Sequence, residues 1–231
     1  MIGGKAIFLM FPGFSDRMFE FFLALQFNNN REFFHENHAW YEEAVRNPLY
    51  RLIEEVTPVV LEIDPLLETR PVKALCRINR DTRYAHDKSP YRTYMWFTFR
   101  RRQGEQKMQP GLYFDISAQG ASLGMGIYLE NRPLMDALRR RILLEPQALD
   151  ALTPPKGFSL ELQSFKRMAV PEQVPEGLKI WYPARTFYFF QDIQDFTLLK
   201  RSELAQTLAQ GYRALKPAYL LFREMLDNAC D

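Results

Sequence analysis

The spacing of apolar side chains changes along this chain, and that change is the strongest constraint on its fold. In the segments 91–101, 112–117 and 122–128, large apolar residues alternate with polar or small ones, as in strands with one buried face. Before and after this block, apolar residues recur with the 3.6-residue period of amphipathic helices. This order favours an α+β fold, with an antiparallel β-meander packed against N-terminal and C-terminal helices.

The length and apolar content place these elements in one domain. The chain has 231 residues, of which 47% are hydrophobic, enough for a sizeable core. We expect a single domain over 1–231, made of a helical N-terminal part at 15–62, a sheet core at 72–128 with a late strand at 185–193, and a helical C-terminal part at 202–228. Within these parts, the sequence predicts helices at 16–26, 31–45 and 48–61, a first strand at 72–79 and a polar hairpin loop at 103–110.

The charge and the cysteine content limit which partners the protein can bind and in which cellular compartment it is expected. The net charge is +2, from 30 basic and 28 acidic side chains, so any basic site must be local rather than a general nucleic-acid surface. Cys76 and Cys230 are too few to form a disulfide framework. No apolar run approaches the roughly 20 residues of a membrane span. We therefore expect a cytoplasmic protein that does not associate with membranes.

The stretch from Arg77 to Tyr94, which reads RINRDTRYAHDKSPYRTY, holds the densest charge in the chain. Like charges so close together repel one another unless they are paired or bound to an anion. The planar guanidinium of arginine suits phosphate and carboxylate. Five basic residues here outnumber two acidic ones, namely Arg77, Arg80, Arg83, Lys88 and Arg92 against Asp81 and Asp87. This excess predicts an anion-binding pocket.

Residues of the meander extend the predicted site. Alternation places Tyr113 and Asp115 opposite the large apolar residues of their strand, on the same side as Gly124 and Gly126. A glycine pair within a strand often marks the close approach of another backbone or a ligand. If the meander is in sequential order, this side lies near the Arg-rich stretch. The predicted ligand-binding residues are Arg77, Arg80, Arg83, Asp87, Lys88, Tyr91, Arg92, Tyr113, Gly124 and Gly126.

Three functions are consistent with these residues. The first is binding of a small molecule that carries a phosphate or carboxylate, and nucleic acid ranks below such a ligand because the chain is nearly neutral. The second is an enzyme acting on a phosphorylated or carboxylated substrate, with Asp81 as general base or metal ligand. The third is a structural or protein-interaction domain whose charges form a salt-bridge network without a ligand. The oligomeric state is open.

The sequence offers little support for a metal or a cofactor. Glu32 and His35 have the Glu-x-x-His spacing of di-iron bundles, with His38 one turn further, but such sites need a second copy of the motif. The chain contains no Walker loop, nucleophile elbow, zinc quartet or dinucleotide fingerprint. We expect neither a metal nor a cofactor.

The central charged stretch also resembles the hallmark of a family known only as a domain of unknown function. The matching residues are Arg77, Ile78, Arg80, Asp81, Arg83, Tyr84, Asp87, Lys88, Pro90 and Tyr91. Similar elements are Asn29-Asn30-Arg31 with Phe33 and Phe34, Tyr41 and Pro48, Pro110-Gly111 with Tyr113, and the Gly124-x-Gly126 strand. The resemblance covers most of the chain. It implies the same fold class and a bacterial or fungal cytoplasmic origin, and it implies no activity.

Overall fold

The structure, a computed structural model that describes residues 10–102 and 108–228, contains one antiparallel sheet of five strands. The strands are β1 Tyr94–Phe99, β2 Gly111–Ser117, β3 Gly120–Gly126, β4 Ser159–Ser164 and β5 Ala184–Ile193. They stand in the order β1-β2-β3-β5-β4, so the first three form the predicted meander. Together with the helices, this sheet confirms the α+β class.

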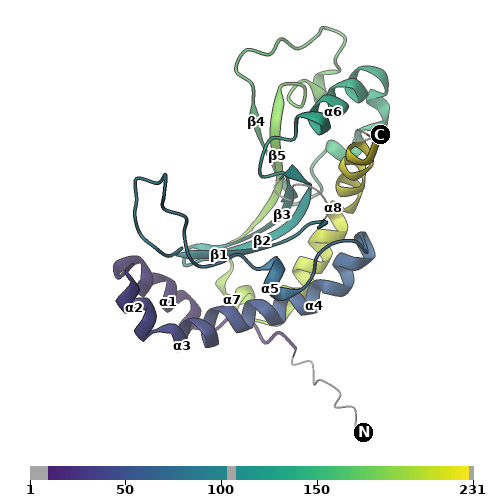
Figure 1. Ribbon diagram of the computed structural model, residues 1–231. Helices are drawn as coiled ribbons and strands as arrows, with labels where there is room; N and C mark the ends of the chain where they lie inside the picture. The colour runs from purple at the N-terminus through teal and green to yellow at the C-terminus, as the bar shows by residue number, and fades with distance from the viewer. Residues whose placement is uncertain (1–9, 103–107, 229–231) are drawn as a thin grey trace.

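Helices cover one face of the sheet and leave the other face open. The longer helices are α1 Asp16–Phe27, α4 Asn47–Ile63, α6 Arg132–Leu144 and α8 Glu203–Asn228. The shorter ones are α2 Arg31–Glu36, α3 His38–Tyr41, α5 Pro71–Ala74 and α7 Phe196–Leu199. Figure 1 shows α4 and α8 on the convex side of the curved sheet, while the connection that precedes β1 rises on the concave side. We call this concave side the open face.

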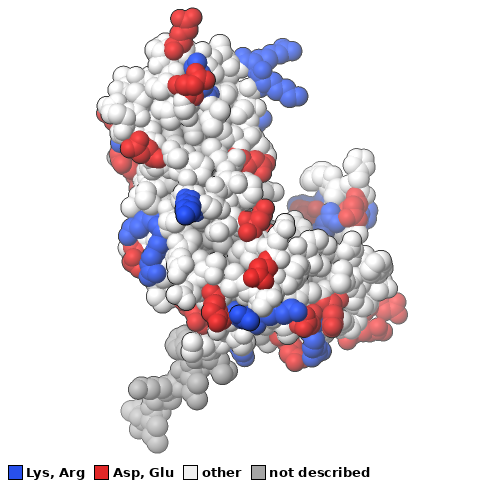
Figure 2. All heavy atoms as spheres, turned by 180° about the vertical axis from the view of Figure 1, so that it is seen from behind, with Lys and Arg blue, Asp and Glu red and all other residues white. Residues whose placement is uncertain are grey.

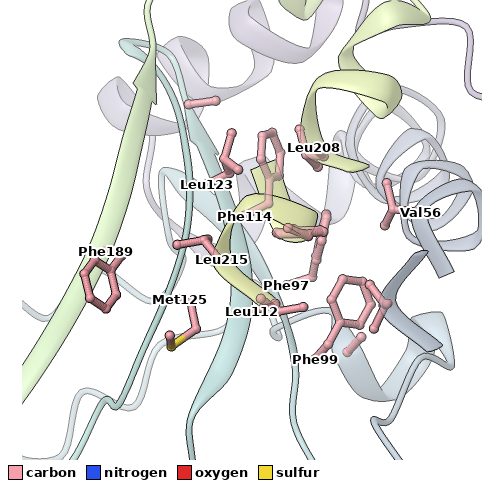
Figure 3. Packing of buried hydrophobic residues seen from close by; sticks show 14 of the residues in the cluster. Val56, Phe97, Phe99, Leu112, Phe114, Leu123, Met125, Phe189, Leu208 and Leu215 are labelled. Carbon is pink, nitrogen blue, oxygen red and sulfur yellow. The ribbon is translucent and has the colours of Figure 1, made fainter. Parts of the chain in front are cut away.

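The core lies between the sheet and the helices, because alternate side chains of each strand point to one face. Figure 3 shows strand side chains pointing towards Val56 of α4 and towards Leu208 and Leu215 of α8. Burial of each large apolar side chain contributes about 1.5–3 kcal/mol, so this face holds the layers together. The strand residues buried there include Phe97, Phe99, Leu112, Phe114, Leu123, Met125, Phe187 and Phe189.

The N-terminal helices differ in one respect from the prediction. Asn30 caps α2 as expected, since its side chain accepts a hydrogen bond from the Phe33 amide at 2.9 Å. The predicted helix at 31–45 breaks at Asn37 and then continues, through a π-helical turn at Glu42–Arg46, directly into α4. A π-turn loosens the helical hydrogen-bond pattern, which allows Pro48 to follow without ending the helix.

The predicted strand at 72–79 is wrong. Pro71 begins the four-residue helix α5 instead, because proline has the φ of a first helical position and needs no amide there. After α5, isolated bridges join this segment to its neighbours, Leu75 with Phe97 and Asn79 with Tyr91. The sheet core therefore starts at β1.

The edge strand β4 is a strand that the sequence analysis did not predict. Leu160 and Leu162 alternate with polar residues and lean on the core, but the segment has only six residues and two large apolar side chains. Its neighbour β5 agrees closely with the late strand predicted at 185–193. The predicted hairpin loop at 103–110 falls largely outside the described residues, as does Cys230.

Candidate functional site

The Arg-rich turn, residues 77–92, pairs much of its charge within itself. Arg80 forms an ion pair with Asp87. Arg83 is bound to Asp81 through two nitrogens, with Nη2 at 2.7 Å and Nε at 2.9 Å from the carboxylate oxygens. The turn projects at the right in Figure 2, where basic and acidic side chains lie together on it. Its middle is therefore an exposed charged loop with internal ion pairs.

Further hydrogen bonds close the turn. Asp87 accepts hydrogen bonds from the amide and hydroxyl of Ser89, at 2.9 and 2.6 Å. These bonds and the Arg80 ion pair hold the pKa of Asp87 well below its usual range. Lys88 Nζ donates to the Thr82 carbonyl at 3.0 Å. Each of these contacts ties the turn to itself.

The two ends of the turn lie in different surroundings. Arg77 lines a hollow of about 250 Å³ beside α2, α3 and the π-turn. Tyr91 is buried and stacks on Phe34 with 4.2 Å between ring centroids. The side chain of Asn29 binds the Tyr91 backbone twice, donating to its carbonyl at 2.9 Å and accepting from its amide at 3.0 Å. Tyr91 thus anchors the turn to the helical layer.

Arg92 and Arg80 line a separate hollow of about 360 Å³ at the base of the turn. The Arg92 guanidinium lies over the Trp96 ring at 4.8 Å. Its Nε is buried without a hydrogen-bond partner in the described structure. Of the five cations in the turn, these two share a hollow, whereas Arg77 faces another and Arg83 is largely exposed.

A further hollow, of about 380 Å³, lies on the open face of the sheet, and we call it the open-face hollow. Residues of β1, β2, β3 and β5 that point away from the core line it, together with Arg100 and Tyr128, which lie just beyond the ends of β1 and β3. Tyr94 belongs both to this hollow and to the one at the base of the turn. The lining residues are Tyr94, Trp96, Thr98, Arg100, Gly111, Tyr113, Asp115, Gly126, Tyr128 and Tyr188.

Glycines make room for these large side chains. Gly111 and Gly126 are cross-strand partners in the floor. A Cβ at Gly111 would lie 2.5 Å from Cγ of Arg100, so the absence of a side chain lets Arg100 lie across the strand. A Cβ at Gly124 would lie 2.8 Å from the Tyr113 ring, which covers this glycine. Gly111 and Gly124 are thus packed under the side chains of Arg100 and Tyr113.

Arg100 is the cation of the open-face hollow. Its Nε is buried and has no hydrogen-bond partner, and no carboxylate of the described residues forms an ion pair with it. Burial lowers the pKa of Arg100. The nearby hydroxyls of Tyr188 and Tyr128 raise it, but they offset the effect of burial only in part. Partial burial of a guanidinium without a counter-ion is costly, and an anionic ligand would relieve that cost.

Asp115 is the second charged group of the hollow. Its carboxyl has no hydrogen bond or cationic partner among the described residues. Burial, and after it the carboxylate of Asp192, raise the pKa of Asp115 to about 6. The group is therefore largely ionised at neutral pH although its surroundings oppose the charge.

Three tyrosines support the hollow. The rings of Tyr113 and Tyr188 meet edge to face with 6.2 Å between centroids. Burial raises the pKa of both phenols, so they are neutral at physiological pH. From α8, the Tyr212 hydroxyl donates to the Tyr113 carbonyl at 3.2 Å. The wall is thus tied to the helical layer.

Of the residues predicted for ligand binding, Tyr113 and Gly126 line the open-face hollow and Gly124 lies beneath the Tyr113 ring. Arg92 and Arg80 lie at the neighbouring hollow. Sequence analysis missed the residues of β1 and β5 that line the site, above all Arg100. Their signal was available, since Tyr94, Trp96, Thr98 and Arg100 are alternate residues of the strand predicted at 91–101.

The described residues contain no group of three or more His, Cys, Asp or Glu side chains arranged to hold a metal ion. His38, considered above with Glu32 and His35, instead lies 3.6 Å from Glu42 on its own helix. No helix in the described part of the chain is both long and apolar enough to cross a membrane.

Comparison with protein families agrees with the resemblance noted in the sequence. The model of the conserved hypothetical protein family DUF2461 matches residues 17–220. The chain belongs to this family. The DUF2461 match includes all five strands, the residues that line the open-face hollow and the Arg-rich turn. None of the curated proteins matches the chain.

Proposed function

We propose that this protein binds a small molecule carrying a carboxylate or phosphate group in the open-face hollow, with Arg100 as the partner of the anion. One observation carries the proposal: Arg100, whose Nε is buried without a hydrogen-bond partner, lines a hollow and has no carboxylate partner among the described residues. Arginine binds such groups through paired hydrogen bonds of roughly twice the usual strength. Within the turn, Arg80 and Arg83 are less suited, because they already have carboxylate partners.

The walls suggest the rest of the ligand. Trp96, Tyr113 and Tyr188 present aromatic surface in the same hollow as Arg100. Pockets for small molecules combine such apolar walls with a few polar groups that fix orientation. An organic body with a flat or apolar part would therefore bind better than a bare inorganic ion.

The nearly balanced charge of the chain, with 30 basic and 28 acidic side chains, suits a small molecule better than nucleic acid. Basic and acidic side chains are interspersed over the face seen in Figure 2, without a broad field of positive charge. Nucleic-acid binding depends on many phosphate contacts from such a field. Asp81, the predicted general base, is exposed and bound to Arg83, so we assign it no chemical role.

Ligand binding can be measured by calorimetry and by the rise in melting temperature. The probes are benzoate, phenyl phosphate and the neutral analogue benzamide, with inorganic phosphate as the bare anion. We expect the two organic anions to bind and benzamide to bind at least tenfold more weakly. Arg100→Met should weaken the anions by about 10- to 100-fold, because it removes the charge and keeps much of the volume.

Two variants serve as controls. Arg102→Met removes an exposed arginine that pairs with Glu68, and it should leave binding unchanged. Arg92→Met tests the hollow at the base of the turn. If it abolishes binding while Arg100→Met does not, the anion binds there instead. Absence of binding by every anion would contradict the proposal altogether.

A further inference from the structure

Asp115 adds a second requirement to the open-face hollow. The carboxyl lines the same hollow as Arg100 and is partly buried, yet no described residue compensates its charge. Aspartates are rarely buried without a partner, because loss of hydration penalises the charged form. A group left in this condition at the wall of a pocket points to a partner that comes from outside the chain.

Asp115 and Arg100 lie too far apart to form an ion pair with each other. In the β1–β2 register, Asp115 lies opposite Trp96, whereas Arg100 follows Phe99 and lies beside Gly111. The two backbones are thus four residues apart along the strands, which is about 13 Å. Thr98 and Tyr113 occupy the row between them. The hollow therefore has a basic end and an acidic end.

The groups around Asp115 make it a site for a cation. From β5, the exposed carboxylate of Asp192 adds charge of the same sign. The cross-strand neighbours of Asp115, which are Trp96 on β1 and Ser122 on β3, are uncharged. Tyr113 on its own strand and Tyr212 below it on α8 are neutral phenols. Arg92 lies over Trp96, and its charge acts on Cys76 rather than on Asp115.

We propose that the ligand is dipolar, with its anionic group at Arg100 and a protonated nitrogen at Asp115. This inference rests on the proposed function, since the same hollow must bind the anion. A protonated amine or amidine would give the carboxyl the counter-ion it lacks and would donate hydrogen bonds to it. The aromatic walls between the two ends would enclose the body of the molecule.

The acidic end also sets a pH dependence. The Asp115 carboxyl loses its charge as the pH falls below about 6, while aliphatic amines stay protonated. The gain in affinity from the nitrogen should therefore be present above about pH 6 and fade below it. The contribution of Arg100 should not change over this range, because a guanidinium remains charged.

Three matched compounds test the inference: para-(aminomethyl)benzoate carries both charges, para-methylbenzoate only the anion, and para-(aminomethyl)benzamide only the cation. Calorimetry at about pH 7.5 should show the first binding about 10- to 100-fold more tightly than either of the others. Asp115→Asn should abolish the advantage of the dipolar compound over para-methylbenzoate. Asp192→Asn, at an exposed position, should have a much smaller effect.

The outcomes separate this inference from the proposed function. If para-methylbenzoate binds through Arg100 as tightly as the dipolar compound, the dipolar ligand is wrong and anion binding stands. The same holds if Asp115→Asn leaves the advantage intact, or if that advantage is as large at about pH 5, where most of the carboxyl is protonated, as at about pH 7.5. If no compound binds, or if Arg100→Met has no effect on any of them, both ideas are wrong.

Discussion

Arg100 and Arg101 are neighbours in the chain, yet they point to opposite faces of the sheet and meet different surroundings. On the helix-covered face, Arg101 Nε lies 2.7 Å from Asp64, and Tyr219 donates to the same carboxylate at 2.5 Å. On the open face, the buried Nε of Arg100 has no hydrogen-bond partner in the described structure. Asp115 on that face likewise has no partner there.

This difference separates charges that stabilise the fold from charges available to a ligand. The hydrogen bonds to Asp64 outweigh the effect of burial and lower its pKa, whereas burial without such bonds raises the pKa of Asp115. A carboxylate that the protein satisfies contributes to folding. A carboxylate that it leaves unsatisfied reduces stability until a ligand compensates it.

The largest expected effect is the loss of Asp64. Asp64→Ala should reduce the free energy of unfolding by about 3–5 kcal/mol, because the hydrogen bonds of Arg101, Tyr219 and the Leu66 amide to this carboxylate are all lost. Urea unfolding measures this. Glu62→Ala, two residues earlier, removes an exposed ion pair with Arg213 and should cost no more than about 1 kcal/mol. Equal effects of the two substitutions would contradict the contrast between the faces.

The second largest expected effect is an increase in the free energy of unfolding, on replacement of Asp115. The raised pKa of Asp115 means that the folded state binds more protons than the unfolded state between about pH 4 and pH 6. Ionised Asp115 therefore lowers stability above about pH 6, and this cost disappears as the pH falls. Asp115→Asn should raise the free energy of unfolding at pH 7 by on the order of 1–3 kcal/mol.

The same measurement at low pH provides the check on Asp115. Below about pH 4, both the wild-type protein and Asp115→Asn are neutral at this position, so their stabilities should converge. A variant that is less stable at neutral pH would show that Asp115 is a structural group like Asp64.

A smaller loss is expected on the helix-covered face at Tyr212. Tyr212→Phe keeps the buried ring and removes the hydroxyl that donates to the Tyr113 carbonyl. The free energy of unfolding should fall by about 0.5–1.5 kcal/mol, measured by urea unfolding. An unchanged or higher stability would indicate that this bond does not hold the wall of the hollow in place.

The smallest effect is expected in the Arg-rich turn. Arg83→Gln removes an exposed partner of Asp81, and solvent screens such a pair strongly. We expect the same melting temperature and the same affinity for phenyl phosphate as in the wild-type protein. A large loss of affinity would indicate that the anion binds at the Arg-rich turn and not in the open-face hollow.

Local patterns in the sequence were enough for the fold class and for the faces of the central strands. Period-two alternation predicted the meander and placed Tyr113 and Asp115 on the face that proved to be open. The same rule failed at 72–79, where Pro71 favours a helical turn over a strand. It also left β4 unrecognised, because an edge strand needs only a weak apolar pattern.

What the sequence by itself determined was which residues are charged and which way the strand residues point. The density of charge in the turn was visible in that way, and so was the opposite orientation of Arg100 and Arg101. The tertiary structure alone decided which of these charges has a partner. Asp64 reaches Arg101 from the end of α4, and no described carboxylate reaches Arg100. Desolvation and pairing depend on groups distant in the chain, so no local pattern encodes them.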